Sequence, residues 1–120
     1  MRRCGCLLAS VLWLFAGVCG ALADPNYPTR SIRVLIPYAA GGLTDVVARH
    51  YAEHLRKSLG QNVIVENKPG ASGIIAIEEM ARAKPDGYTL MVGNVSTNAI
   101  TPLLFAKKMT ANYEKDVTAV

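Results

Sequence analysis

Apolar and polar positions alternate along the chain in a pattern that predicts three strands and two helices. Residues 32–36 (IRVLI), 63–66 (VIVE) and 88–92 (YTLMV) are short, apolar and rich in β-branched side chains, which is typical of buried strands. Residues 44–59 and 74–83 repeat apolar side chains three and four positions apart, which predicts amphipathic helices. The order βαβαβ with short loops predicts an α/β fold, in which right-handed crossovers build a parallel sheet covered by helices.

The helix over residues 44–59 has the clearest predicted face and ends. Thr44 or Asp45 is expected to cap its start, and Gly60 follows where a left-handed stop is needed. Its predicted inward stripe is Val47, Ala48, Tyr51, Ala52, Leu55 and Leu59. In residues 74–83 we expect Ile74, Ile77, Met80 and Ala81 to face inward, and Glu78, Glu79 and Arg82 to face solvent. Pro102 is expected to start a short helix through Ala106.

Residues 1–23 have the pattern of an export signal. Arg2 and Arg3 precede an apolar stretch over residues 7–17, and small residues around Ala23 favour cleavage between Ala23 and Asp24. A membrane anchor is less favoured because glycines and alanines weaken the second half of the segment. A lipoprotein signal at Cys19 is also less favoured, since a bulky valine precedes that cysteine. The sequence therefore predicts an exported protein whose mature part, residues 24–120, is one α/β domain.

Setting this leader aside changes the charge and the cysteine content. The whole chain carries a net charge of +4, from 13 basic and 9 acidic side chains. Without Arg2 and Arg3 the mature part is at +2, and its basic residues form no stripe interleaved with aromatics, so we expect no nucleic-acid binding. Cys4, Cys6 and Cys19 all lie in the leader, so the mature part holds no cysteine for a disulfide, a nucleophile or a metal. No cofactor is predicted.

Glycines and hydroxyl side chains gather in the loops that follow the predicted strands, over residues 38–44, 67–73 and 93–98. In a parallel sheet these loops share the carboxyl edge, where ligands bind. Glycines there let the backbone approach a ligand, and the exposed amides of helix N-termini attract anions. The predicted ligand is a small carboxylate. The glycine spacing fits neither a dinucleotide fingerprint nor a phosphate loop. The alternative that the glycines only form turns stays open.

Two residue patterns carry alternative interpretations. Asp45 is expected to stabilise the helix dipole, to brace its loop, or to accept a hydrogen bond from a ligand. His50 and His54 belong to an H-x-x-E-H pattern, which in other proteins binds zinc. A small secreted metal-dependent hydrolase is therefore an alternative function. We favour a non-enzyme, because the two histidines fall on the polar face of the helix and no third ligand or nucleophile set is evident.

Three ordered blocks resemble the N-terminal lobe of the Bug-type substrate-binding proteins of tripartite tricarboxylate transporters. The first runs from Tyr27-Pro28 through residues 32–38 (IRVLIPY) to residues 41–45 (GGLTD). The second is residues 65–73 (VENKPGASG), and the third is residues 84–90 (KPDGYTL). The resemblance covers residues 27–120. It implies one lobe of a two-lobed fold like that of type II periplasmic binding proteins, and a receptor that passes a small carboxylate to a membrane permease from the periplasm.

The resemblance also implies which residues hold the ligand. They are Tyr38, Ala40, Gly41, Gly42, Thr44 and Asp45 in the first loop, Ala71, Ser72 and Gly73 in the second, and Ser96 and Thr97 in the third. The sequence departs from the family pattern at Ala39-Ala40 and at Ser72. Either departure is expected to alter the choice of ligand more than the fold.

Length is the largest departure from the family pattern, because family members carry a second lobe beyond this point. We expect the 120-residue chain to be a truncated form that binds its solute weakly or not at all. We also expect it to expose apolar surface that the second lobe would cover. A third alternative function is an interaction module that binds a protein partner without any small ligand.

Overall fold

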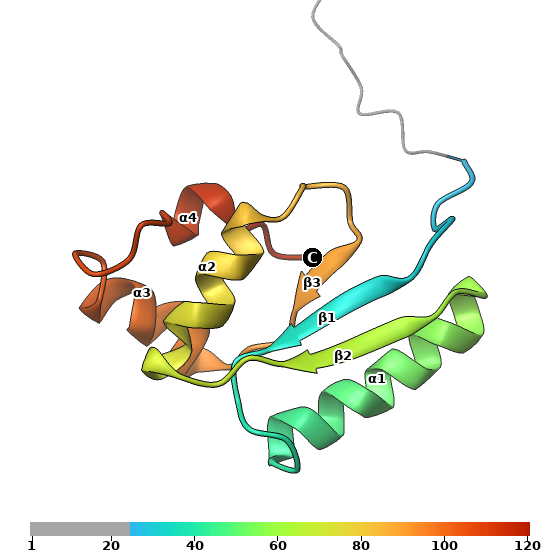
Figure 1. Ribbon diagram of the computed structural model, residues 1–120, viewed down its shortest axis with the longest axis horizontal. Coiled ribbons are helices and arrows are strands. Elements are labelled where there is room, and N and C mark those ends of the chain that lie inside the picture. Colours follow the sequence, from blue (N-terminus) through green and yellow to red (C-terminus); the bar gives the residue numbers. More distant parts are fainter. Residues whose placement is uncertain (1–24) are drawn as a thin grey trace, which may run out of the picture.

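A three-stranded parallel sheet lies at the centre of the molecule (Figure 1). The structure, a computed structural model, describes residues 25–120, so the predicted signal peptide lies outside the described residues. The strands are β1 (Ile32–Ile36), β2 (Val63–Asn67) and β3 (Thr89–Met91), in the order β2-β1-β3. Ile32 pairs with Val63, and Arg33 pairs with Thr89. The predicted parallel α/β fold is confirmed.

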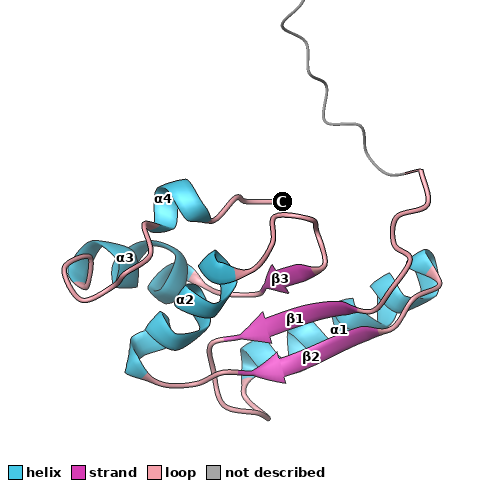
Figure 2. Cartoon of the chain, turned by 45° about the horizontal axis from the view of Figure 1, so that its top comes forward, coloured by secondary structure: helices cyan, strands magenta, loops and turns pink. Residues whose placement is uncertain are grey.

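Helices cover both faces of this sheet. The helix α1 (Leu43–Leu59) connects β1 to β2, and α2 (Ile74–Arg82) connects β2 to β3. Figures 1 and 2 show these two helices on opposite sides of the sheet, as two right-handed crossovers in opposite directions require. After β3 the chain forms a π-helical turn, η2 (Ser96–Ile100), and the short helices α3 (Thr101–Leu104) and α4 (Tyr113–Asp116).

The central strand β1 supplies most of the core. Ile32, Val34, Leu35 and Ile36 are all buried, because helices pack on both faces of the strand. Side chains alternate between the faces, so Val34 and Ile36 lie toward α1 and Arg33 and Leu35 toward α2. By the parallel register, Val65 and Asn67 of β2 share the α1 face. This alternation places the last residue of β2 beside the start of α1.

The inward face of α1 differs from the prediction. Ala48 and Ala52 are buried as expected, but Val47 and Tyr51 are exposed, and Asp45 is buried in their place. The face that packs on the sheet is therefore narrow and lined by small side chains, which let the helix approach closely. The reason for the error is Asp45, whose buried carboxylate shifts the centre of the stripe by roughly 50°, or about a seventh of a turn, from the one that hydrophobicity indicates.

The helix ends also differ in part from the prediction. Gly60 ends α1 in a left-handed conformation, with φ 67°, as expected. The start is one residue earlier than predicted, because Gly42 is the N-cap and no side chain caps the helix. Neither Thr44 nor Asp45 has that role. At the C-terminal side, helical structure begins at Ser96, well before Pro102, which lies in the first turn of α3.

In α2 the apolar prediction holds for Ile77, which is fully buried together with Ala76, whereas Ile74, Met80 and Ala81 are only partly buried. Glu79 does not face solvent freely as predicted. Its carboxylate lies 2.8 Å from Arg33 Nη2 and 3.2 Å from Lys68 Nζ.

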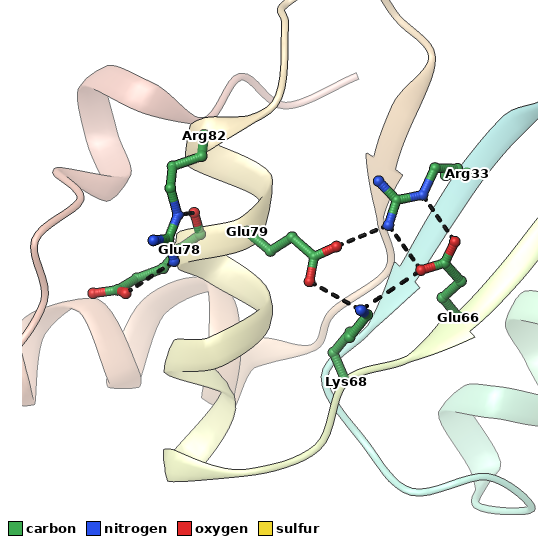
Figure 3. Close-up of polar contacts among 6 residues, drawn as sticks. All are labelled: Arg33, Glu66, Lys68, Glu78, Glu79 and Arg82. Atoms are coloured by element: carbon green, nitrogen blue, oxygen red, sulfur yellow. Dashed lines mark hydrogen bonds and ion pairs between the residues drawn. The ribbon is translucent and has the colours of Figure 1, made fainter.

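Arg33, Glu66, Lys68 and Glu79 form an ionic cluster that joins α2 to β1 and β2 (Figure 3). The guanidinium of Arg33 donates two hydrogen bonds of 2.8 Å to the two carboxylate oxygens of Glu66. This bidentate geometry is the strong form of an ion pair. Because Arg33 bonds Glu79 as well, the pKa values of both glutamates are held below their usual range. The cluster therefore fixes α2 on its face of the sheet.

Within residues 25–120 the structure contains no helix that is both long and apolar enough to cross a membrane.

We expect Glu79→Gln to lower the free energy of unfolding by about 0.5–1 kcal/mol, because it removes one charge from a half-exposed cluster. The measurement is urea denaturation at low salt and again at 0.5 M NaCl, where screening should shrink the difference. Glu114→Gln, a change at an exposed carboxylate, is the control and should stay within about 0.5 kcal/mol of the parent. Equal losses in the two variants would contradict the anchoring role of the cluster.

Candidate functional site

The three loops that follow β1, β2 and β3 meet at the carboxyl edge of the sheet. The α-carbon of Gly73 in the second loop lies so close to the third loop that a β-carbon there would stand 2.6 Å from Thr97 Cγ2. The same position would be 3.5 Å from Pro37, which follows β1. The edge is therefore a tight junction of segments that are far apart in the sequence, as the βαβαβ order predicts.

Asp45 is the centre of the hydrogen bonds that hold the first loop. The residue is 3% exposed, and its Oδ2 accepts from the Gly41 amide at 2.9 Å. Arg49 Nε, one turn further along α1, lies 3.1 Å from Oδ1 and 3.0 Å from Oδ2. Asn67 Nδ2 donates to Oδ1 at 2.9 Å and also to the Tyr38 carbonyl at 3.1 Å. One carboxylate thus joins both ends of the loop to α1 and β2.

These donors also set the ionisation of Asp45. Chiefly the Arg49 guanidinium, and then the Gly41 amide and the Asn67 side chain, lower its pKa to about 2 from an ordinary value of 3.8. The carboxylate therefore stays charged at neutral pH, and both of its oxygens accept hydrogen bonds. Of the roles considered for Asp45, the structure shows the bracing of its loop.

The third loop is tied to the first through Tyr38. The Tyr38 hydroxyl donates to Asn94 Oδ1 and lies 3.4 Å from Thr97 Oγ1. Thr97 Oγ1 in turn accepts from the Asn94 amide at 3.1 Å. Gly93 precedes this turn, and a β-carbon there would overlap the side chains of Thr97 and Asn98. A larger residue at Gly93 would therefore require the side chains of Thr97 and Asn98 to move.

The entry to α2 has an unusual backbone. Ala71 and Ser72 adopt φ of 46° and 55°, and Gly73 adopts 89°. The left-handed region costs a residue with a β-carbon about 1–2 kcal/mol. Thr101, buried at the start of α3, donates from Oγ1 to the Ser72 carbonyl at 2.8 Å and helps to hold this conformation.

Two helix N-termini open at this edge without a side-chain cap. The N-cap residues of α1 and α2 are Gly42 and Gly73, and neither offers a side chain to accept from the first-turn amides. In α1 the first hydrogen bond of the helix runs from the Val46 amide to the Gly42 carbonyl, so earlier amides have no partner within the helix. Unpartnered amides and the positive end of the helix dipole favour an anion.

The predicted site residues divide into two groups. Tyr38, Gly41, Asp45, Ser72, Gly73 and Thr97 are connected by the contacts described above. Ala40, Gly42, Ala71 and Ser96 are exposed on the same loops, and Thr44 is half-buried in the first turn of α1. The Gly41 amide already donates to Asp45, so in this structure it is not available to a ligand.

Sequence reasoning missed the residues that support these loops, which are Arg49, Asn67, Asn94 and Thr101. For Asn67 a signal existed, because positions 63, 65 and 67 of a strand share a face and α1 packs on that face.

A cavity among the described residues lies elsewhere. It has a volume of about 670 Å³ and is lined by residues of η2, α3 and α4 with their connecting loop, including Pro102, Leu103 and Tyr113. None of the predicted site residues lines it. In the described part of the chain, no group of three or more histidine, cysteine or acidic side chains is placed to hold a metal ion.

We expect Asp45→Asn to lower stability at pH 7, because an amide oxygen cannot accept from all the donors that now bond the carboxylate. The folded-state pKa is about 2 against an ordinary 3.8, so the contribution of Asp45 is complete above about pH 4 and is lost as the pH falls toward 2. Thermal melts between pH 2 and 7 should show that, as the pH falls from about 4 to 2, the variant loses less stability than the parent protein does. Parallel curves for the two proteins would contradict the assignment.

Gly73→Ala tests the contact between the second and third loops, and Gly60→Ala is its matched control. Both glycines have positive φ, but a β-carbon at Gly60 would meet nothing within 4 Å. We expect about 1 kcal/mol of destabilisation for Gly60→Ala from backbone strain alone. Gly73→Ala should cost roughly 1–3 kcal/mol more, because Thr97 must move. Equal costs in urea denaturation would show that the loops do not meet in this way.

Comparison with known proteins places this arrangement in a family. Residues 47–120 match the family model described as "Tripartite tricarboxylate transporter family receptor". A UPF0065 protein of Bordetella bronchiseptica is 43% identical over an alignment of 127 positions, which covers 99% of this chain and 37% of the relative. The chain spans about a third of the length of the curated relatives it matches.

Solved structures agree in fold and sequence. MatC from Rhodopseudomonas palustris, solved with bound malate, is 41% identical with a TM-score of 0.68, over 75% of this chain and 30% of that one. The periplasmic binding protein BugD is 52% identical with a TM-score of 0.52, over 54% of this chain and 22% of its own. The predicted family is confirmed, and it is a family of solute-binding receptors and not of enzymes. This chain belongs to the receptor family of the tripartite tricarboxylate transporters.

Proposed function

We propose that this chain forms one side of the binding site of a receptor for small carboxylates. The observation that carries the proposal is that two helix N-termini without a side-chain cap, at Gly42 and Gly73, both lie at the carboxyl edge of the sheet. A carboxylate placed there meets the unpartnered first-turn amides of α1 and the positive ends of two helix dipoles; at the start of α2 the Ile74 amide already donates to the Ala71 carbonyl. Ser72 and Thr44, beside these helix starts, offer hydroxyl donors. The malate bound by MatC belongs to the same chemical class.

The support for this site comes from rigidity as well as from charge. Preorganised amides bind an anion better than mobile ones, because less conformational entropy is lost on binding. Asp45 and Asn67 brace the first loop, and Thr101 holds the second through the Ser72 carbonyl. Asp45 lies behind the first loop, and because its carboxylate is occupied by Gly41, Arg49 and Asn67, it acts as a support and not as a ligand contact in this proposal.

The wider biological role is proposed on family grounds. BugD is described as a periplasmic binding protein, and residues 1–23 of this chain have the pattern of an export signal. We therefore propose a periplasmic receptor that delivers its solute to a membrane permease. Because the chain spans about a third of its relatives, we expect contacts from outside this sequence to be needed for high affinity, and millimolar binding by the chain alone.

Titration of the ¹⁵N-labelled chain with succinate, followed by amide chemical shifts, tests the site at millimolar affinity. We expect the largest saturable shifts at the first turns of α1 and α2. Succinamide has the same carbon skeleton without the charges, and it should leave these amides unmoved at equal ionic strength. Equal effects of the two compounds, or shifts confined to the cavity between α3 and α4, would contradict a carboxylate site at the sheet edge.

Leu43→Pro removes one first-turn amide of α1 with little harm to the fold. Leu43 is the first helical residue and is 82% exposed, and Gly42 before it is extended, which is the conformation that proline requires of its predecessor. We expect about fivefold weaker succinate binding, the value of one exposed hydrogen bond of about 1 kcal/mol. Leu43→Ala keeps the amide and should bind like the parent. Unchanged binding by Leu43→Pro would exclude this helix terminus as an anion contact.

A further inference from the structure

We propose that His50 and His54 form a surface chelate for a divalent transition-metal ion, with two nitrogen ligands from the protein. The two residues lie four positions apart on α1, and both side chains are exposed on the face opposite the sheet. Their ring centroids are 4.5 Å apart, with 55° between the ring planes. Imidazoles that bind one metal at about 2.0–2.1 Å place their ring centroids roughly 4.5–5 Å apart. The pair therefore has the spacing of a chelate before any metal binds.

The hydrogen bond of His54 selects the ring nitrogen that is free to bind. His54 Nδ1 lies 3.0 Å from the His50 carbonyl oxygen. A carbonyl oxygen only accepts, so Nδ1 carries the proton, and in the neutral ring the lone pair is on Nε2. Metal-bound histidines in general donate their second ring N–H to a carbonyl or carboxylate in this way, which orients the ring and raises its basicity.

Among residues 25–120 the surroundings offer two protein ligands. The nearby carboxylate of Glu53 is paired with Arg56 at 2.8 Å and with Lys57 at 3.5 Å, and Asp45 is buried on the other face of the helix. Water must then fill the remaining positions of the metal. Two exposed imidazoles suit Cu²⁺ best, then Ni²⁺ and Zn²⁺, by the general order of stability for nitrogen ligands. The site is a binding site with exchangeable metal and lacks the three-residue ligand set of a zinc hydrolase.

The proposal is independent of the carboxylate site. The sheet-facing side of α1 is made by Asp45, Ala48 and Ala52, and the histidines lie on the other side of the helix. Substituting an exposed histidine leaves the packing of α1 unchanged, so the variants should fold as the parent does.

The test is a Cu²⁺ titration of the full chain by calorimetry, with electron paramagnetic resonance spectra recorded after each addition of Cu²⁺. We expect His50→Gln and His54→Gln each to weaken binding at this site by about tenfold or more, and to remove the coupling of one imidazole nitrogen from the spectrum. The cysteines and the amino terminus also bind copper, but they are the same in every variant, so the difference between variants reports the histidines.

A double variant controls for the number of histidines. His54→Gln combined with Tyr51→His keeps two histidines but places them at neighbouring positions, which point in different directions on a helix. We expect this protein to bind no better than His54→Gln alone. Identical titrations for the parent and both single variants, or full recovery in the double variant, would overturn the chelate.

Discussion

The loops at the carboxyl edge of the sheet depend on a buried carboxylate whose hydrogen-bonding capacity is filled. A buried, unpaired charge is too costly to persist, so Asp45 must be surrounded by donors, and those donors come from three places in the chain. Gly41 belongs to the loop after β1, Arg49 to the second turn of α1, and Asn67 to the end of β2. Because Asn67 also bonds the Tyr38 carbonyl, satisfying this one group fixes the loop at both ends. Because the buried carboxylate of Asp45 must be hydrogen-bonded, the backbone of the loop after β1 is held in one conformation.

That geometry keeps the helix starts open. In many helices a serine or aspartate side chain caps the first amides, which would occupy the positions that an anion needs. Here Asp45 is three positions into the helix and turns back to bond Gly41, and the cap positions of α1 and α2 are glycines. The ionic cluster of Arg33, Glu66, Lys68 and Glu79 holds α2 on the opposite face of the sheet and so fixes the second helix start relative to the first. In the proposed site, the residues that hold the elements together are therefore different from the glycines that leave the helix starts without a side-chain cap.

The architecture was predictable because it depends on periodicity and topology. The apolar run of β1, the stop at Gly60 and the parallel order follow from local patterns and from the handedness of crossovers. The inward face of α1 was not predictable from hydrophobicity, since a charged residue takes a buried position and Val47 and Tyr51 are exposed. The role of Glu79 was missed for a related reason, because an acidic residue on a helix faces solvent by default and its partners Arg33 and Lys68 lie on other elements. At the edge of the sheet, the glycine-rich loops identified the place, but the supporting residues Asn67, Asn94 and Thr101 appear only when the loops are seen together.

The most direct test of the account is a crystal structure of the chain grown or soaked with malate. The account predicts a carboxylate group within hydrogen-bond distance, about 2.7–3.2 Å, of first-turn amides of both α1 and α2, with the Asp45 contacts unchanged behind it. A carboxylate bound only in the cavity lined by α3 and α4, or a structure in which Asp45 leaves Gly41 and Asn67 to contact the ligand itself, would contradict it.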